Sequence, residues 1–322
     1  MRRFAIIGLG EVGTIFARDL HAVGVEEIAG YDISAEACAR AEAARHVVLC
    51  TSAAETAART EVVFVAVTAG SDAAAMAQLR GGLAHGPFVV DVNSVSPATK
   101  RQAAEIVTEL GGRYVEAAVM TSIGARGLRS PMLLGGRHAQ DFIAAMQRFD
   151  MRLDLFGEEI GGASSVKMCR SIMIKGLEAP TTECMLAARR YGVEGKVLAS
   201  LADTFDHPDW PGLARCVISR ALIHGRRRSE EMREVARTVE EAGFRPVMSE
   251  AIAEKQAWAA GLGRKLAPGA LAADELAPLL DALLALEPRG PKAPSVAQQS
   301  QRTKSNQPIL PSLASVRRKS RR

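Results

Sequence analysis

The glycine pattern Gly8-Leu9-Gly10-Glu11-Val12-Gly13 constrains the fold of this chain more than any other feature. It follows an apolar run over residues 3–8 and precedes a helical stretch over residues 12–23. In such a pattern Gly8 permits a tight turn, Gly10 lets a pyrophosphate approach the backbone, and Gly13 lets the helix pack on the strand. The pattern predicts a dinucleotide-binding βαβ unit. The alternative is a tight strand-to-helix turn without a nucleotide.

Asp32 follows the second apolar run, about twenty residues after the last glycine. A carboxylate there accepts hydrogen bonds from the ribose hydroxyls of NAD and repels the 2′-phosphate of NADP. We therefore expect NAD as the cofactor, with NADP less favoured. Ligands of open α/β sheets bind beyond the carboxyl ends of the strands. The contacts expected after later strands are Val67, Thr68, Asn93 and Ser94.

The hydrophobic pattern divides the chain into three parts. Apolar runs alternate with Ala-rich helical stretches as far as residue 162, which predicts a doubly wound, mostly parallel α/β Rossmann domain over residues 1–162. The runs cover residues 3–8, 28–31, 47–49, 62–67, 88–92, 114–119, 132–134 and 153–156. From residue 163 to residue 287 every periodic stretch is helical, so we expect an all-α domain for substrate binding and dimerisation. Residues 288–322 are expected to form a disordered basic tail.

Charge and composition argue against several classes of protein. The net charge is +5, but residues 290–322 hold eight Lys or Arg and no acidic residue. The rest of the chain is therefore mildly acidic, and we expect no specific nucleic-acid binding. No apolar run is long enough to span a membrane. The five cysteines lack metal-ligand spacing, which favours reduced thiols in the cytoplasm and no metal.

Four sequence blocks carry a resemblance to a known family. They cover residues 8–13, 91–97, 115–136 and 157–171. In this order the chain resembles the 3-hydroxyisobutyrate and 6-phosphogluconate dehydrogenase family of β-hydroxyacid dehydrogenases over about residues 1–190. Residues 171–258 resemble a less-characterised helical domain of 6-phosphogluconate dehydrogenase-like proteins. The resemblance implies an NAD-dependent oxidoreductase that acts on the CH–OH group of a small (3-)hydroxy acid, and a homodimer.

The resemblance also implies particular site residues. The catalytic lysine of the family falls on Lys167, and its asparagine one turn later is replaced by Ser171. The family's Ser-Gly-Gly substrate turn is replaced by Met120, Thr121 and Ser122. We expect the Ser122 hydroxyl, with Thr121 beside it, to hold a substrate carboxylate in a pocket of altered shape.

The residues around Lys167 support an acid/base role by themselves. Lysine can serve as a general base when burial and nearby positive charge lower its pKa. Helical spacing places Lys167, Ser171 and Lys175 on one face, among apolar neighbours, with Arg170 close by. These residues are candidate contacts for an anionic substrate. The alternative is an exposed lysine on an amphipathic helix, with solvated charges at Arg170 and Lys175.

A second group of charges lies on one stripe of a later helix. Its members are Arg220, His224, Arg227, Arg228 and Glu231. Arginine gives bidentate contacts to carboxylates and phosphates, so Arg220 and His224 are candidate contacts for a small anionic substrate. The alternatives are a solvated arginine run over residues 226–228 and a structural histidine.

Two other functions stay open at this point. An imine or keto reductase could use the same scaffold, although retention of Lys167 argues against an imine reductase. A non-catalytic, NAD-binding regulatory protein would explain the departures at Met120 and Ser171. The retained lysine and the hydroxyl of Ser122 favour an enzyme.

Overall fold

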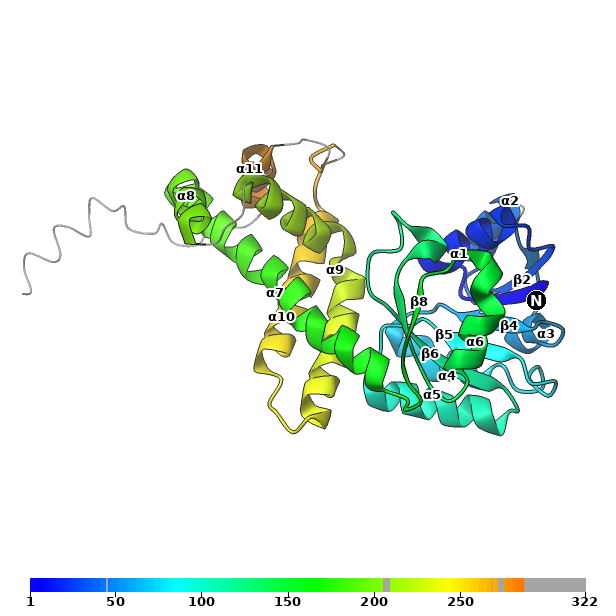
Figure 1. Ribbon diagram of the computed structural model, residues 1–322. Coiled ribbons are helices and arrows are strands. Elements are labelled where there is room, and N and C mark those ends of the chain that lie inside the picture. The colour runs from blue at the N-terminus through cyan, green and yellow to red at the C-terminus, as the bar shows by residue number, and fades with distance from the viewer. Residues whose placement is uncertain (45, 205–208, 268, 272–274, 287–322) are drawn as a thin grey trace, which may run out of the picture.

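The computed structural model describes residues 1–44, 46–204, 209–267, 269–271 and 275–286 (Figure 1). Residues 1–161, here called the sheet half, form a sheet flanked by helices, and residues 162–286, the helical half, contain no strand among the described residues. The expected order of an α/β Rossmann fold followed by an all-helical region is confirmed. The predicted basic tail, residues 288–322, lies outside the described residues.

The sheet has eight strands in the order β3-β2-β1-β4-β5-β6-β7-β8. Their bounds are β1 (Arg3–Ile7), β2 (Glu27–Tyr31), β3 (Val48–Leu49), β4 (Val62–Val65), β5 (Phe88–Asp91), β6 (Arg113–Val119), β7 (Met132–Gly135) and β8 (Leu153–Gly157). Each apolar run expected from the sequence forms a strand. Neighbouring strands are parallel except β6 and β7. The order changes direction between β1 and β4, and such a switch point opens a crevice at the carboxyl ends of the strands.

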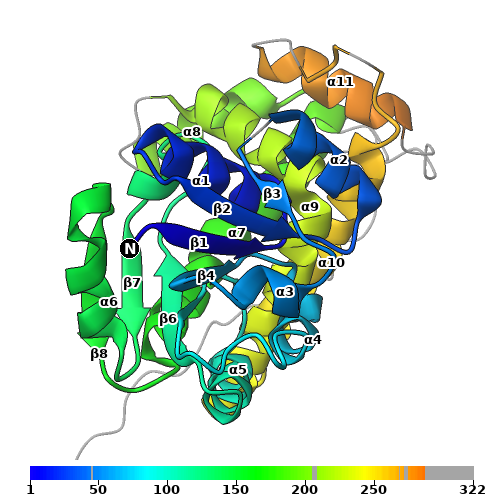
Figure 2. The same cartoon turned by 90° about the vertical axis from the view of Figure 1, so that its right-hand side faces the viewer.

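Helices cover both faces of this sheet (Figure 2). They are α1 (Glu11–Ala22), α2 (Ala35–Ala44), α3 (Ala53–Ala57), α4 (Asp72–Ala77), α5 (Pro97–Glu109) and α6 (Ala139–Met146). Successive side chains of a strand point to opposite faces. Phe4 and Ile6 of β1 accordingly pack with α1 and α6, whereas Ala5 and Ile7 pack with the layer of α3, α4 and α5. This alternation builds one apolar core on each face.

The helical half consists of long packed helices. They are α7 (Gly162–Tyr191), α8 (Glu194–Thr204), α9 (Trp210–Glu241), α10 (Val247–Gly263) and α11 (Leu276–Leu286). Helix α7 leads away from the sheet half, with α9 and α10 beside it and α8 and α11 at the far end (Figure 1). None of the helices in the described part of the chain has the length and apolar character needed to cross a membrane.

Buried carboxylates join the two halves. Glu116 of β6 is fully buried and accepts hydrogen bonds from the backbone N–H groups of Gly161 (2.7 Å) and Ser164 (2.6 Å) at the start of α7. Glu234 of α9 accepts from the backbone N–H of Ser96 (3.0 Å) at the start of α5. A carboxylate at a helix N-terminus satisfies free N–H groups and complements the helix dipole. These contacts hold the start of α7 against β6 and hold α9 against the start of α5.

Candidate active site

The glycine loop between β1 and α1 has the geometry that its sequence predicts. Gly8 adopts a φ of +95°, and a Cβ there would collide with the carbonyl oxygen of Ala66. A Cβ at Gly13 would collide with the carbonyl oxygen of Gly8, so only glycine lets α1 start so close to β1. At Gly10, by contrast, nothing lies within 4 Å of a built Cβ. The backbone at Gly10 is therefore open to an incoming group.

Asp32 is fixed beside this loop at the carboxyl end of β2. Its Oδ2 accepts a hydrogen bond from the backbone N–H of Leu9 (2.7 Å), and its Oδ1 accepts one from the backbone N–H of Ser34 (2.8 Å). The side chain is half-buried. The carboxylate is thus oriented by backbone groups at the position where a nucleotide-binding sheet presents its ribose acceptor.

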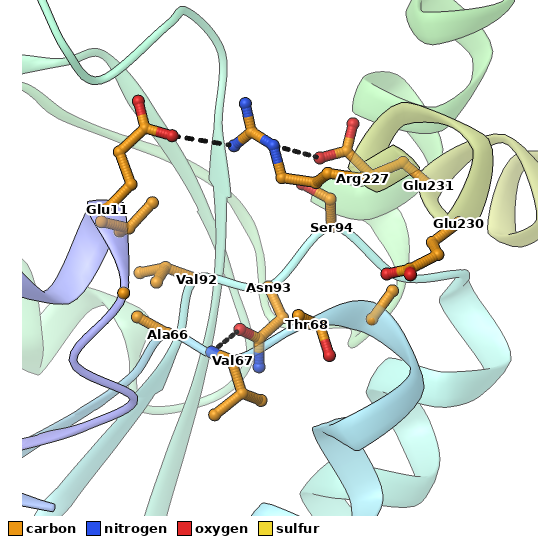
Figure 3. A pocket seen from close by; sticks show the side chains of 13 residues that line it. Glu11, Ala66, Val67, Thr68, Val92, Asn93, Ser94, Arg227, Glu230 and Glu231 are labelled. Atoms are coloured by element: carbon orange, nitrogen blue, oxygen red, sulfur yellow. Dashed lines mark hydrogen bonds and ion pairs between the residues drawn. The ribbon is translucent and has the colours of Figure 1, made fainter. Parts of the chain in front are cut away.

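A cleft lies between the carboxyl edge of the sheet and helix α9 (Figure 3). It contains about 680 Å³ of empty space, a volume that includes the part open to solvent. Its lining comprises Gly10, Glu11, Val12, Ala66, Val67, Thr68, Ala69, Val92, Asn93, Ser94, Arg227, Glu230 and Glu231. The structure therefore brings seven of the predicted cofactor contacts close to three charged residues of α9. Glu230 was not among the residues singled out from the sequence.

Asn93 is held by a buried polar network that the sequence analysis did not identify. Its Oδ1 accepts a hydrogen bond from the backbone N–H of Val67 (2.7 Å), and its Nδ2 donates to Asp72 Oδ1 (2.5 Å). Burial and the neighbouring Asp91 carboxylate raise the pKa of Asp72 to about 7. Asp91 in turn pairs with Lys100, whose Nζ lies 2.8 Å from its Oδ1. The network joins the loops after β4 and β5; a charged residue ending an apolar strand was the signal that could have found it.

The face of α7 expected to carry catalysis is also formed. Ser171 and Lys175 are buried, and Lys175 Nζ donates a hydrogen bond to Ser171 Oγ (3.1 Å). The same Nζ lies 2.9 Å from Glu231 Oε2 of α9, an ion pair that joins this face to the cleft. Lys167 is partly buried one turn before Ser171. Burial, together with the charges of Lys100 and Lys175, lowers the pKa of Lys167 to about 7 against the opposing effect of Glu231.

Comparisons with known proteins agree with this geometry. The family profile for the NAD-binding domain of 6-phosphogluconate dehydrogenase matches residues 3–147, and a domain of unknown function (DUF1932) matches residues 188–259. A conserved hypothetical protein from Sinorhizobium meliloti 1021 has 32% identity and a TM-score of 0.68, over 88% of this chain and 96% of its own. A conserved protein of unknown function, reported to be structurally similar to 3-hydroxyacid dehydrogenases, has 31% identity and a TM-score of 0.60, over 81% of this chain and 99% of its own.

The chain belongs to the 3-hydroxyisobutyrate dehydrogenase-like β-hydroxyacid dehydrogenases. Mitochondrial 3-hydroxyisobutyrate dehydrogenase from Mus musculus is 24% identical over 63% of this chain. The chain spans 62% of the length of that enzyme. The resemblance inferred from the four sequence blocks is thereby confirmed at the level of the family, and the chain is related to NAD-dependent hydroxyacid dehydrogenases.

Several residues expected to bind substrate lie elsewhere. Thr121 and Ser122 are exposed on the loop after β6 and are absent from the cleft lining. Arg170 is exposed on α7. His224 is half-buried, and burial together with the charges of Arg227 and other arginines lowers its pKa. The cleft lining therefore contains seven of the predicted cofactor contacts but none of the predicted substrate contacts, and Lys167 is absent from it as well.

Arg228 belongs to a buried cluster between α7, α9 and α10, and the partly exposed Arg220 lies at its margin. Glu178 of α7 is fully buried, with its two oxygens 2.7 and 2.8 Å from Arg228 Nη1. Arg220 Nε lies 3.3 Å from Glu178, and Gln256 Nε2 donates to Glu178 at 2.9 Å. The interpretation of residues 226–228 as a solvated run is therefore wrong for Arg228, because α9 turns this side chain into the helix interface. Among the described residues no group of His, Cys, Asp and Glu could hold a metal ion.

Proposed function

We propose that this protein transfers a hydride between NAD and the hydroxyl-bearing carbon of a small hydroxy acid, with Lys167 as general acid and base. One observation carries the proposal: Lys167 is partly buried, has a pKa of about 7 and is affected electrostatically by Glu231. Glu231 lines the same cleft as Gly10 of the glycine loop. A group with this pKa is present in both protonation states near neutral pH, which suits proton transfer in either direction.

Lys167 carries the proton chemistry in this proposal. In the oxidation direction its free amine accepts the hydroxyl proton of the substrate as the carbonyl forms. In the reduction direction its ammonium donates that proton to the carbonyl oxygen. NAD, when bound, accepts the hydride from the carbon. Because Lys167 is partly buried, water competes less for its proton than it would at an exposed lysine.

The chain offers a matching cradle for NAD. The open backbone at Gly10 and the N-terminus of α1 suit the pyrophosphate, since free N–H groups and the helix dipole favour an anion. Asp32 is placed to accept the ribose hydroxyls, while Val67, Thr68, Asn93 and Ser94 supply the opposite wall of the cleft. We propose NAD over NADP because the Asp32 carboxylate would repel a 2′-phosphate.

The proposed substrate is a small acid whose carboxylate contacts the hydroxyls of Thr121 and Ser122. These two side chains are exposed on the loop after β6. Ser171 and Lys175 are buried and paired with each other, so we assign them to the support of the site. Arg220 is engaged by Glu178 and is no longer favoured as a substrate contact.

We also propose a homodimer that uses an apolar stripe on α7. Val166, Met173, Ile174 and Leu177 are 40%, 74%, 37% and 43% exposed, respectively. Exposed apolar patches of this kind usually mark interaction surfaces, and a second copy of the chain would bury them. A mass measurement by light scattering should give twice the chain mass, and Met173→Glu should shift the protein towards the monomer.

A substrate screen tests the proposed activity. Purified protein would be assayed with NAD or NADP against 2- and 3-hydroxy acids, and in reverse against keto acids and cyclic imines, by following the absorbance of the reduced nicotinamide. We expect turnover of a hydroxy acid with NAD. Turnover of imines alone would establish the reductase alternative, and NAD binding without any turnover would establish the regulatory one.

Asp32→Ala tests the basis of cofactor choice. We expect the native protein to bind NAD more tightly than NADP and the variant to lose most of this preference, because the repelling carboxylate is gone. Calorimetric titration with both nucleotides gives the two affinities. Exposed Glu36 on α2 supplies a control, since Glu36→Ala removes the same charge from a surface ion pair. Equal affinities in the native protein would remove Asp32 from the explanation.

A further inference from the structure

The ion pair between Lys175 and Glu231 lies on the α7 face that carries the proposed catalytic Lys167, about two turns further along the helix. The reaction itself does not explain it. Lys175 Nζ is 2.9 Å from Glu231 Oε2 and donates to Ser171 Oγ at 3.1 Å. The side chains of Lys175 and Glu231 are only 9% and 16% exposed. A buried pair with this geometry restricts both side chains, so the direction of the Glu231 carboxylate is fixed by Lys175.

The charged groups that face Lys167 come from several packed elements. They are Glu231 of α9, Lys175 of α7, Asp91 of β5 and Lys100 of α5. Asp91 and Lys100 are buried against each other at 2.8 Å, so the Asp91 carboxylate offsets part of the effect of Lys100 on Lys167, while Glu231 has the largest effect of the four charged groups. The balance around Lys167 therefore depends on how much of the Glu231 charge is available to it.

Glu231 is shared among cations. Besides Lys175, Arg227 approaches it, with Nε 4.0 Å from Glu231 Oε1 (Figure 3). Although burial works against ionisation, Lys175 and Arg227 hold the pKa of Glu231 below its ordinary value. The carboxylate is thus ionised, and its best hydrogen-bond geometry is directed to Lys175. Lys167 has no direct ion pair with any group in the described part of the chain.

We infer that Lys175 is a positioning residue: it holds the Glu231 carboxylate and so leaves Lys167 free to release its proton. The inference rests on the proposed role of Lys167. Loss of Lys175 would remove a like charge and also free a carboxylate, and both changes favour the ammonium form of Lys167. Loss of the Glu231 charge would favour the free amine. Opposite shifts from the two partners of one ion pair are therefore expected.

The alternative is that the pair only stabilises the packing of α7 on α9. In that case Lys175→Met and Glu231→Gln would both lower the melting temperature, and neither would move the titration of Lys167 in a direction set by charge. Lys175→Arg separates these roles further. It keeps a cation next to Glu231, so a positioning role predicts titration close to that of the native protein.

The experiment measures the titration of Lys167 directly, without relying on turnover. The full-length protein and its variants would be treated with an amine-acylating reagent across a pH series, and modification of Lys167 followed by peptide mass spectrometry. We expect the midpoint to rise by about one pH unit in Lys175→Met and to fall by about one unit in Glu231→Gln. Arg190→Met, which removes an exposed cation from the far end of α7, is the matched control and should leave the midpoint unchanged.

The outcomes distinguish this inference from the proposed function. Shifts in the same direction, or no shift in either variant, overturn the role of Lys175 even when the native protein oxidises a hydroxy acid. Opposite shifts support the role even when no hydroxy acid is turned over. If Lys175→Met does not fold, as judged by circular dichroism, Lys175→Gln carries the test with the same expected direction. In active protein the pH limb of kcat/KM for oxidation should move with the Lys167 midpoint.

Discussion

Buried charged residues lie at different kinds of position in the sheet half and in the helical half. In the sheet half the strands are almost wholly apolar, and the buried ion pair of Asp91 with Lys100 lies where β5 ends. In the helical half Glu178 and Arg228 are buried midway along their helices, between α7, α9 and α10. The pair of Asp91 with Lys100 is thus placed by the end of a strand, and the pair of Glu178 with Arg228 by the packing of one helix on another.

This difference predicts which substitutions should affect function and which should affect stability. The parallel strands deliver their polar ends to one edge, which forms one side of the cleft. The helices deliver Glu231 to the same cleft but also enclose charges that are absent from its lining, such as Glu178. Changes at these positions should therefore affect catalysis, stability or pH dependence separately.

The largest effect is expected from Lys167→Met. Positioned acid/base catalysis contributes about 100- to 10,000-fold to a rate, so turnover should fall by that factor. NAD affinity should stay nearly constant, because the sheet half holds the cofactor. Steady-state kinetics and a separate NAD titration measure the two quantities. Arg in place of Lys167 should not restore turnover, since a guanidinium keeps its proton near neutral pH.

If the sheet half binds NAD and Lys167 of the helical half transfers the proton, the substitution should change NAD affinity less than turnover. Near-native turnover in Lys167→Met would contradict this assignment and remove the lysine from the mechanism. A large loss of NAD affinity would show instead that α7 helps to hold the cofactor.

Glu178→Ala should destabilise the protein without acting through the cleft. It leaves Arg228 buried without its carboxylate partner, and breaking such a pair typically costs about 3–5 kcal/mol of unfolding free energy. Arg226→Ala is the matched control from the same arginine run: its side chain is 87% exposed and its contact to Glu230 is 3.8 Å, so about 0.5 kcal/mol or less is expected. Urea denaturation gives both values. If the two variants lost similar amounts of unfolding free energy, burial of the Glu178–Arg228 pair would not increase its contribution to stability.

The smallest effect concerns the pH dependence contributed by Asp72. Burial and Asp91 raise its pKa from 3.8 to about 7, so the folded protein keeps a proton that the unfolded chain releases. The contribution of Asp72 to stability is therefore full below its ordinary pKa and is lost as the pH rises through about 7. The slope is at most about 1.4 kcal/mol per pH unit.

Asp72→Asn should remove this slope and keep the oxygen that accepts from Asn93. Unfolding free energies measured from about pH 5 to about pH 8 should fall less steeply in the variant than in the native protein. Parallel curves for the two proteins would show that Asp72 titrates at its ordinary pKa. NAD affinity, measured on the same samples, reports whether the Asn93 contact to Val67 depends on this carboxyl group.

The sequence by itself determined the local geometry of the site. The spacing of Gly8 and Gly13 predicted a turn that only glycine fits, and the collisions met by an added Cβ confirm it. A spacing of four residues predicted that Lys167, Ser171 and Lys175 share a face, and the bond from Lys175 to Ser171 agrees. These features depend on residues close in the chain, where the periods of strand and helix fix direction.

Only the tertiary structure decided which groups meet across elements. Glu231 meets Lys175 over a separation of 56 positions along the chain, and Arg228 meets Glu178 over 50. Neither partner can be read from a helical period, because rotation and crossing of α7 and α9 determine which stripes face each other. The same reason explains why Arg226 is exposed while Arg228, two residues later, is buried. The spacing of residues along the sequence determines which of them share a face of a helix, and the packing of the helices determines which faces meet.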